Sequence, residues 1–307
     1  MKTVELTACP VCGSADADPL DLGQGRHRRC RDCGTVYTAE YGDPDAVFVD
    51  GYFDEDSPFG IDVTHPRFQA ALEVISETRL EALERIVGEK GSLLDVGCGT
   101  GEFPAVAARR GWRVQGVELM AEAAARARER GLDVHTGYLE ESGLPERSYD
   151  VVSALHVLEH IPESIPFIRL LARYVRPGGH VMIEVPNFGS ELRERTLGGW
   201  IHLRPLEHLV HFTPDTLRRA LSDSGLEVVS VTTPSWPQRE HTLEEALANL
   251  GRPTWRGWLA PFCSTREVVG VPSKVPSSPV RWLLRAVERT YRRRLRGMVV
   301  VAIARVP

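Results

Sequence analysis

The pattern of apolar and polar positions divides the chain into segments of different structure. Residues 66–88 carry apolar side chains at helical spacing and end at Gly88. From residue 92 onward, short apolar runs alternate with segments of helical spacing, which predicts an α/β fold: a doubly wound parallel sheet with helices on both faces. We expect strands at 92–96, 113–118, 132–135, 149–154, 180–185, 226–232 and 298–304, and helices at 102–110, 120–130, 163–175, 214–224 and 280–296.

Two Cys-x-x-Cys pairs lie near the N-terminus, in a segment with little apolar periodicity. Cys9 and Cys12 form the first pair, Cys30 and Cys33 form the second, and a glycine follows each pair. Four thiolates in a tetrahedral arrangement suit zinc, and a closed four-sulfur site is structural because it leaves no open coordination position. We therefore predict a structural zinc ion. An iron–sulfur site and a knuckle that has lost its metal are the alternatives.

A glycine-rich loop joins the strand at 92–96 to the following helix, with the sequence LLDVGCGTG at residues 93–101. Glycine lets the backbone turn sharply and come close to a ligand. Glu118 ends the next strand, where an acidic side chain can bind both hydroxyls of a ribose. In dinucleotide enzymes a further glycine would stand at Glu102, whose carboxylate would instead repel a pyrophosphate at the helix N-terminus.

With these motifs the chain resembles the class I S-adenosylmethionine-dependent methyltransferases. The glycine loop matches their first motif, Glu118 matches their acidic ribose ligand, and residues 150–160 and 176–179 match two later motifs. The resemblance implies S-adenosylmethionine as cofactor and a seven-stranded, Rossmann-like methyltransferase sheet with an N-terminal zinc ribbon and a C-terminal insert. It implies cofactor contacts for Asp95, Gly97, Cys98, Gly99, Gly101, Glu118, Leu119, Tyr138, Leu139, Leu155 and Tyr52, the last as an aromatic cover.

The same resemblance divides the chain into four expected parts. The expected parts are a zinc-ribbon module at 1–40, a linker and helical lid at 41–90, a cofactor domain at 91–232 completed by the strand 297–307, and a substrate-side insert with a basic helix at 233–296. Arg79, on the lid helix, is expected to be exposed to solvent unless it reaches the methionine carboxylate of the cofactor.

Histidines supply the candidate catalytic groups. Glu207-His208 resembles the Glu-His segment of the sugar C-methyltransferases, which implies that His208 acts as a general base; a structural hydrogen bond is the alternative. Glu207 and His156 complete the catalytic set, although residues placed like His156 and Glu159 are more often cofactor-edge or structural groups than bases. The spacing of the histidines is poor for a metal site.

Charge and composition narrow the choice of substrate. The net charge is −5, although residues 281–296 hold seven Arg and one Glu, so nucleic acid is a disfavoured partner. We expect O- or C-methylation of a small molecule, either a sugar nucleotide or a natural-product intermediate. The alternatives are an RNA methyltransferase, since a zinc ribbon also precedes an rRNA guanine methyltransferase, and a non-catalytic cofactor-binding scaffold.

The sequence also indicates where in the cell the protein is expected. No apolar run approaches the length of a membrane helix, and the first residues lack the basic start and apolar stretch of a secretion signal. We expect a cytoplasmic protein without a transmembrane segment. The sequence does not fix the oligomeric state, and a homodimer is one alternative.

Overall fold

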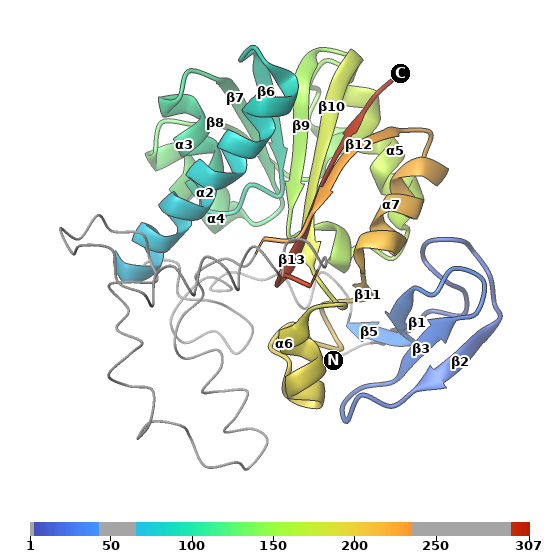
Figure 1. Cartoon of the computed structure of the whole chain (residues 1–307). Helices are drawn as coiled ribbons and strands as arrows, with labels where there is room; N and C mark the ends of the chain where they lie inside the picture. The colour runs from blue at the N-terminus through green and yellow to red at the C-terminus, as the bar shows by residue number, and fades with distance from the viewer. Residues whose placement is uncertain (1–2, 43–65, 235–295) are drawn as a thin grey trace, which may run out of the picture.

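The computed structural model describes residues 3–42, 66–234 and 296–307, and its largest part is a seven-stranded sheet (Figure 1). The strand order is β12-β13-β10-β9-β6-β7-β8, and β13 runs antiparallel to both of its neighbours while the other strands are parallel to one another. The strands are β6 (Ser92–Val96), β7 (Arg113–Glu118), β8 (Asp133–Thr136), β9 (Tyr149–Leu155), β10 (Val175–Pro186), β12 (Glu227–Thr232) and β13 (Val299–Arg305).

Helices cover both faces of this sheet, which confirms the expected doubly wound fold, although the expectation of a wholly parallel sheet was wrong for β13. One face packs against α2 and α3, and the other packs against α5 and α7. A capping box of Thr213 and Thr216, with Pro214 in the first turn, starts α7 at the residue that the sequence predicts. The helices are α2 (Pro66–Val87), α3 (Glu102–Arg109), α4 (Ala121–Glu129), α5 (Ser164–Tyr174), α6 (Glu191–Thr196) and α7 (Pro214–Asp223).

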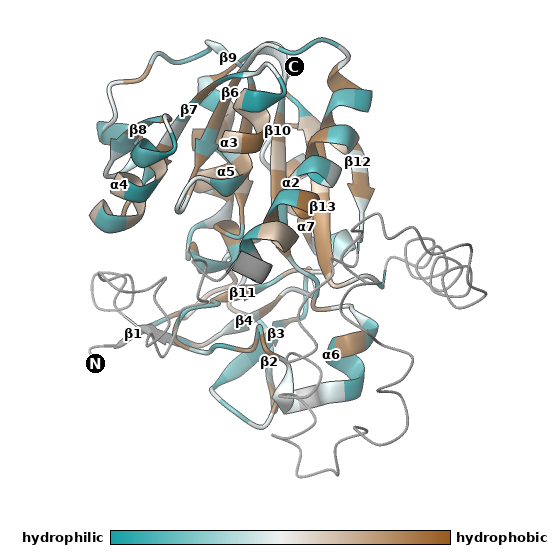
Figure 2. Ribbon diagram, turned by 90° about the vertical axis from the view of Figure 1, so that its left-hand side faces the viewer, coloured by the Kyte–Doolittle hydropathy of each residue, from teal (hydrophilic) through white to brown (hydrophobic). Residues whose placement is uncertain are grey.

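The core follows from the alternation of side chains along the central strands. Leu93 and Val151 point to the α2 and α3 face, whereas their chain neighbours Leu94 and Val152 point to the α5 and α7 face. Because both faces are covered, these strands are apolar along their length, and Figure 2 shows the hydrophobic colour concentrated on the central strands. This buried sheet fixes the positions of the loops at its carboxyl edge.

The N-terminal module is built into the main domain. Its four-stranded sheet has the order β11-β4-β3-β2, and β11 (Val210–His211) comes from the segment just before α7. Cys9, Cys30 and Tyr37 belong to the same buried cluster as Phe212. The remaining strands are β1 (Thr3–Glu5), β2 (Ala17–Leu20), β3 (His27–Cys30), β4 (Val36–Thr38) and β5 (Glu40–Gly42).

Some predictions lie outside the described residues: the cofactor contact of Tyr52, most of the linker, and the insert with its basic helix. Among the helices that the structure does describe, none combines the length and the apolar character required to span a bilayer.

Candidate active site

The glycine loop after β6 has the backbone that its sequence demands. Gly97, Gly99 and Gly101 have φ angles of 71°, 56° and 87°, in the left-handed region that favours glycine. A Cβ atom on Gly97 would lie 2.5 Å from the side chain of Val157. The loop therefore lies directly against the segment that follows β9, with no room for a side chain between them.

Glu118, at the end of β7, holds this loop in place. One carboxylate oxygen accepts the N–H of Gly99 at 2.7 Å, and the other accepts the N–H of Met120 at 3.0 Å. Burial raises the pKa of Glu118, although these backbone hydrogen bonds act in the opposite direction. A buried carboxylate thus stands at the edge of the loop where the sequence predicts a ribose ligand.

Two large apolar side chains lie exposed beside Glu118. Leu119 is 36% exposed and Tyr138 is 50% exposed, although large apolar side chains are usually covered. A hydrogen bond from the N–H of Gly137 to the carbonyl of Glu118, 2.9 Å long, brings their two segments together. This apolar surface is suited to cover a flat ring such as adenine.

Four other predicted cofactor residues are wholly or partly buried. Ser153 donates a 2.6 Å hydrogen bond to Asp95, and burial raises the pKa of Asp95 to about 7. Cys98 lies beneath the loop against Gly116. Leu139 and Leu155 pack against the apolar clusters of the two sheet faces. Asp95, Cys98 and Leu139 are therefore buried rather than open at the surface, and Leu155 is partly so.

A chain of alternating charges runs from α2 to the segment after β9. Arg79 forms a two-pronged ion pair with Glu184, and both side chains are buried. The ring of His156 bridges Glu184 at 2.9 Å and Glu159 at 3.3 Å. The expectation of a solvent-exposed Arg79 was wrong because this residue lies on the apolar face of its helix, four residues from both Ile75 and Leu83.

The ring of His156 has an unusual protonation state within this row of charged side chains. Burial alone would lower its pKa, but hydrogen bonds and charge from Glu159 and Glu184 raise it to about 9, so the ring is protonated at neutral pH. Its backbone φ of 57° lies in the left-handed region, which is costly for a residue other than glycine. His156 therefore donates from both ring nitrogens and has no lone pair with which to accept a proton.

A group of histidine rings lies next to Glu159. The rings of His160 and His208 are 4.8 Å apart, those of His202 and His208 are 5.9 Å apart, and those of His27 and His211 are 5.3 Å apart. Burial lowers the pKa of His208 well below its usual range, and it lowers those of His202 and His211 to about 3. These buried rings are neutral and can offer lone pairs.

Glu207 and the backbone around it orient this group. The side chain of Glu207 pairs with Arg204 at 3.2 Å, and the carbonyl of Glu207 accepts a 2.9 Å hydrogen bond from Nδ1 of His160. From the N-terminal module, the hydroxyl of Thr38 donates to the carbonyl of His208 at 3.1 Å. The module therefore supports the histidine segment directly.

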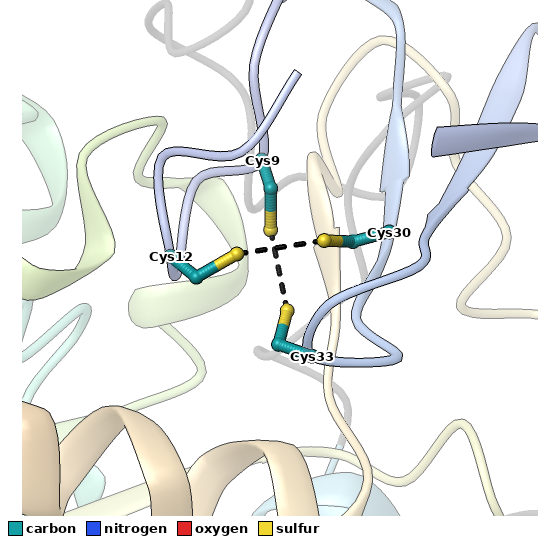
Figure 3. A group of neighbouring side chains, drawn as sticks. All are labelled: Cys9, Cys12, Cys30 and Cys33. Atoms are coloured by element: carbon teal, nitrogen blue, oxygen red, sulfur yellow. Dashed lines mark hydrogen bonds between the residues drawn. The ribbon is translucent and has the colours of Figure 1, made fainter. Parts of the chain in front are cut away.

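The four cysteines form a second centre, shown in Figure 3. The Cys9 and Cys33 sulfurs are 3.5 Å apart, the Cys12 and Cys30 sulfurs are 3.4 Å apart, and all four lie within 4.8 Å of one another. These separations are far longer than a disulfide bond of about 2.05 Å. They are close to the roughly 3.8 Å edge of a tetrahedron with zinc–sulfur bonds of about 2.3 Å. The arrangement fits one tetrahedral ion.

Several residues of this site were not identified from the sequence. Glu184 carried a signal, since it is a charged residue inside the apolar run of β10, and Arg79 carried one through its place on an apolar helix face. The pairing of His160 with His208, and the approach of His27 to His211, depend on segments far apart in the chain. No local pattern could have placed them together.

Comparisons with known proteins agree with this geometry. Residues 66–231, just over half of the chain, match the family model described as "Methyltransferase domain". The ubiquinone biosynthesis O-methyltransferase of Serratia proteamaculans is 38% identical over 163 residues, covering 41% of this chain and 67% of the relative. The corresponding protein of Cronobacter sakazakii is 31% identical over 173 residues, covering 44% and 71%.

A solved structure supports the fold alone. It is an S-adenosylmethionine-dependent methyltransferase of Thermotoga maritima, described as a possible histamine N-methyltransferase, and it aligns with a TM-score of 0.52 at 16% identity. The alignment covers 80% of this chain and 96% of that one. Together, this fold, the family match and the curated relatives show that the chain belongs to the methyltransferase-domain family and is a class I S-adenosylmethionine-dependent methyltransferase.

Proposed function

We propose that the chain transfers the methyl group of S-adenosylmethionine to a hydroxyl oxygen of a small-molecule biosynthetic intermediate. The observation behind this proposal is the position of the histidine group. One of its members, His160, lies in the turn that follows β9, and Val157 of the same turn lies against Gly97 of the glycine loop. Ligands of parallel sheets bind at the carboxyl ends of the strands, so cofactor and acceptor would meet at this edge. The names of the relatives, which specify methyl transfer to oxygen in ubiquinone biosynthesis, support O-methylation.

The residues around Glu118 would hold the cofactor, which supplies a methyl group already activated on a positively charged sulfur. Glu118 would take the ribose hydroxyls, and the exposed Leu119 and Tyr138 would cover the adenine. Gly97 and Gly99 would lie along the methionine part, because their backbone is open to close approach. Asp95, Cys98, Gly101, Leu139 and Leu155 would support the loop from the core side.

The histidine group would prepare the acceptor. A hydroxyl must lose its proton to become a good nucleophile, and a positioned group can assist that loss. Nδ1 of His208 donates to the carbonyl of His202 at 2.8 Å, so Nε2 carries the lone pair. That lone pair can take up a proton or hold a cation, and we place activation of the acceptor on His208. Glu207 and His156 would act as positioning residues, because Glu207 orients His160 and His156 orients Glu159.

We also propose that the four cysteines hold a structural zinc ion. Its role would be to fix β3 and β4, since β4 pairs with β11 and bonds to the His208 segment. A zinc ribbon of this kind would position the acceptor side of the site without contacting the acceptor.

A second candidate function is methylation of a carbon atom in a sugar nucleotide. The order Glu207-His208, buried beside the site, favours it. A carbon acid also has to lose a proton, so His208 would serve either reaction. Methylation of RNA agrees less well with the net charge of −5.

Labelled methyl transfer tests these proposals. The full chain would be incubated with S-adenosylmethionine carrying a labelled methyl group and with separated small-molecule, RNA and protein fractions of the source cells. We expect label in the small-molecule fraction, with an alkali-stable ether in the product. A new carbon–methyl bond would support the second candidate, label in RNA would overturn both, and bound cofactor without any transfer would indicate a scaffold.

A further inference from the structure

The side chains of Glu159, His160 and His208 have the composition of a transition-metal site. One ring nitrogen of each histidine and one carboxylate oxygen of Glu159 lie within 4.8 Å of one another. Two imidazoles and one carboxylate are a common ligand set for divalent transition metals, and they leave other positions on the ion open. We propose that this cluster binds a divalent transition-metal ion, which holds and activates the acceptor hydroxyl. The part that the ion plays in catalysis, though not its binding, rests on the proposed function.

Both imidazole rings are set up as metal ligands. Nδ1 of His160 donates to the carbonyl of Glu207 at 2.9 Å, and Nδ1 of His208 donates to the carbonyl of His202 at 2.8 Å. Each bond fixes the tautomer that leaves a lone pair on Nε2. Histidines that ligate metals almost always donate their other ring N–H in this way, which also makes the coordinating nitrogen more basic.

The carboxylate of Glu159 supplies independent evidence. Only 1% of this residue is exposed, and within the part of the chain that the structure describes its Oε2 atom has no hydrogen-bond partner. Its other oxygen, Oε1, bonds to His156 at 3.3 Å. A buried carboxylate oxygen without a partner is costly, and a cation would satisfy it.

Contacts on Oε1 hold the Glu159 carboxylate in place. The ring of His156 lies between Oε1 of Glu159 and Oε1 of Glu184, and Glu184 in turn pairs with Arg79 on α2. A metal ion at Oε2 would leave these contacts intact.

The geometry requires only small movements. A tetrahedral ion with bonds of about 2.1 Å needs ligand separations of about 3.4 Å, so binding would draw the three side chains together. His160 is only partly buried, unlike Glu159 and His208. The sequence led to the expectation that the histidines are poorly spaced for a metal site. The set proposed here combines Glu159 and His160, from the turn after β9, with His208 from the later loop.

The chemistry balances without any further reagent. A hydroxyl oxygen of the acceptor would occupy an open position on the ion, which lowers the pKa of that hydroxyl, and the proton would leave to water. The oxygen lone pair would then form the new bond to the methyl carbon, while the carbon–sulfur pair returns to sulfur. A methyl ether, S-adenosylhomocysteine and one proton result. A second oxygen on the acceptor, next to the first, could occupy another open position and orient the substrate.

Direct measurement of bound metal tests the proposal. The full chain, keeping its four-cysteine zinc, would be titrated with Mn²⁺ alone and free Mn²⁺ followed by electron paramagnetic resonance, because Mn²⁺ prefers oxygen and nitrogen ligands to thiolates. We expect one bound Mn²⁺ per chain. Glu159→Gln and His208→Ala should each weaken binding at least about tenfold, while His180→Ala, in the middle of β10, should bind as the wild type does.

Two further readouts keep the test decisive. Retention of one zinc per chain and an unchanged circular dichroism spectrum would show that the variants are folded. A wild-type chain that takes up neither Mn²⁺ nor a second zinc ion would overturn the proposal, as would equal Mn²⁺ affinity in all the variants. Methyl transfer by a chain with no ion at this cluster would refute the catalytic role and leave the proposed function standing. A bound ion without any methyl transfer to small molecules would support the metal site and contradict the proposed function.

Discussion

The four-cysteine centre and the histidine group are built in opposite ways. The cysteines come from 25 consecutive residues, and two short knuckles place all four sulfurs together. The histidine group draws on β3, on the turn after β9 and on the loop before β11, which are far apart in the chain. The two centres nevertheless touch through β4 and β11, so the local, rigid centre can hold the dispersed one in position.

The largest expected effect comes from breaking the local centre. Cys30 is buried in the core that the module shares with the main domain, so Cys30→Ser should cost about 4 kcal/mol of folding free energy and lower the melting temperature by roughly 8–16 °C. Methyl transfer should be lost with it. Thermal unfolding and zinc content measure this, with the exposed neighbour Asp32→Ala as control. Equal melting temperatures for the two variants would show that the module is independent.

The next largest loss of stability is expected when the buried ion pair of Arg79 and Glu184 is broken. Arg79→Ala leaves the buried Glu184 carboxylate without its main partner and should cost about 3 kcal/mol. The exposed pair of Arg85 and Glu81 lies on the same helix, and Arg85→Ala should cost less than about 1 kcal/mol. Urea unfolding of the two variants measures the difference. Similar losses would mean that the buried charge chain contributes no more than a surface pair.

The pair of Arg79 and Glu184 also predicts how the free energy of unfolding depends on pH. Burial alone would raise the pKa of Glu184, but Arg79 and His156 lower it to about 2 from an ordinary 4.5. A lowered carboxyl pKa contributes stability that is present above pH 4.5 and lost as the pH falls toward 2. The wild type should therefore lose stability more steeply over this window than Glu184→Gln does. Parallel curves from chemical unfolding at several pH values would contradict this assignment.

A smaller effect is expected where the cofactor would bind. Glu118→Ala removes the acceptor for two backbone N–H groups and the proposed ribose ligand, and should weaken S-adenosylmethionine binding by about 10- to 100-fold. Glu129→Ala, exposed at the end of α4, should have no effect. Isothermal titration calorimetry measures both. Retained affinity in Glu118→Ala would remove Glu118 from the cofactor site.

The smallest change tests the link between the two centres. Thr38→Val keeps the shape of the side chain but leaves the His208 carbonyl without the Thr38 hydroxyl, at a cost of about 1 kcal/mol. We expect methyl transfer to slow by about fivefold while cofactor affinity is unchanged. Thr232→Val, exposed at the end of β12, serves as the control in the same rate assay. A rate equal to the control would separate the module from the site.

The contrast between a locally built centre and a dispersed one also explains which features could be predicted from the sequence. The strands, the cap at Thr213 and the glycine loop follow from local patterns, and the structure has them within a few residues of the predicted bounds. The exception is β10, which begins at Val175 because that residue already pairs with Tyr149. Pairing of β11 with β4 was not foreseeable, since a two-residue strand carries almost no signal. Burial of Arg79 with Glu184 required knowing which helix face meets the sheet.

Activation of the acceptor by the histidine group is best tested by the rate of methyl transfer in His208→Ala. The measurement uses the acceptor isolated from the labelled small-molecule fraction, with His180→Ala as control and cofactor affinity and zinc content measured on the same samples. We expect a loss of at least about 100-fold in the transfer rate, with S-adenosylmethionine affinity and zinc content unchanged. A transfer rate equal to that of His180→Ala would contradict the assignment of acceptor activation to this group.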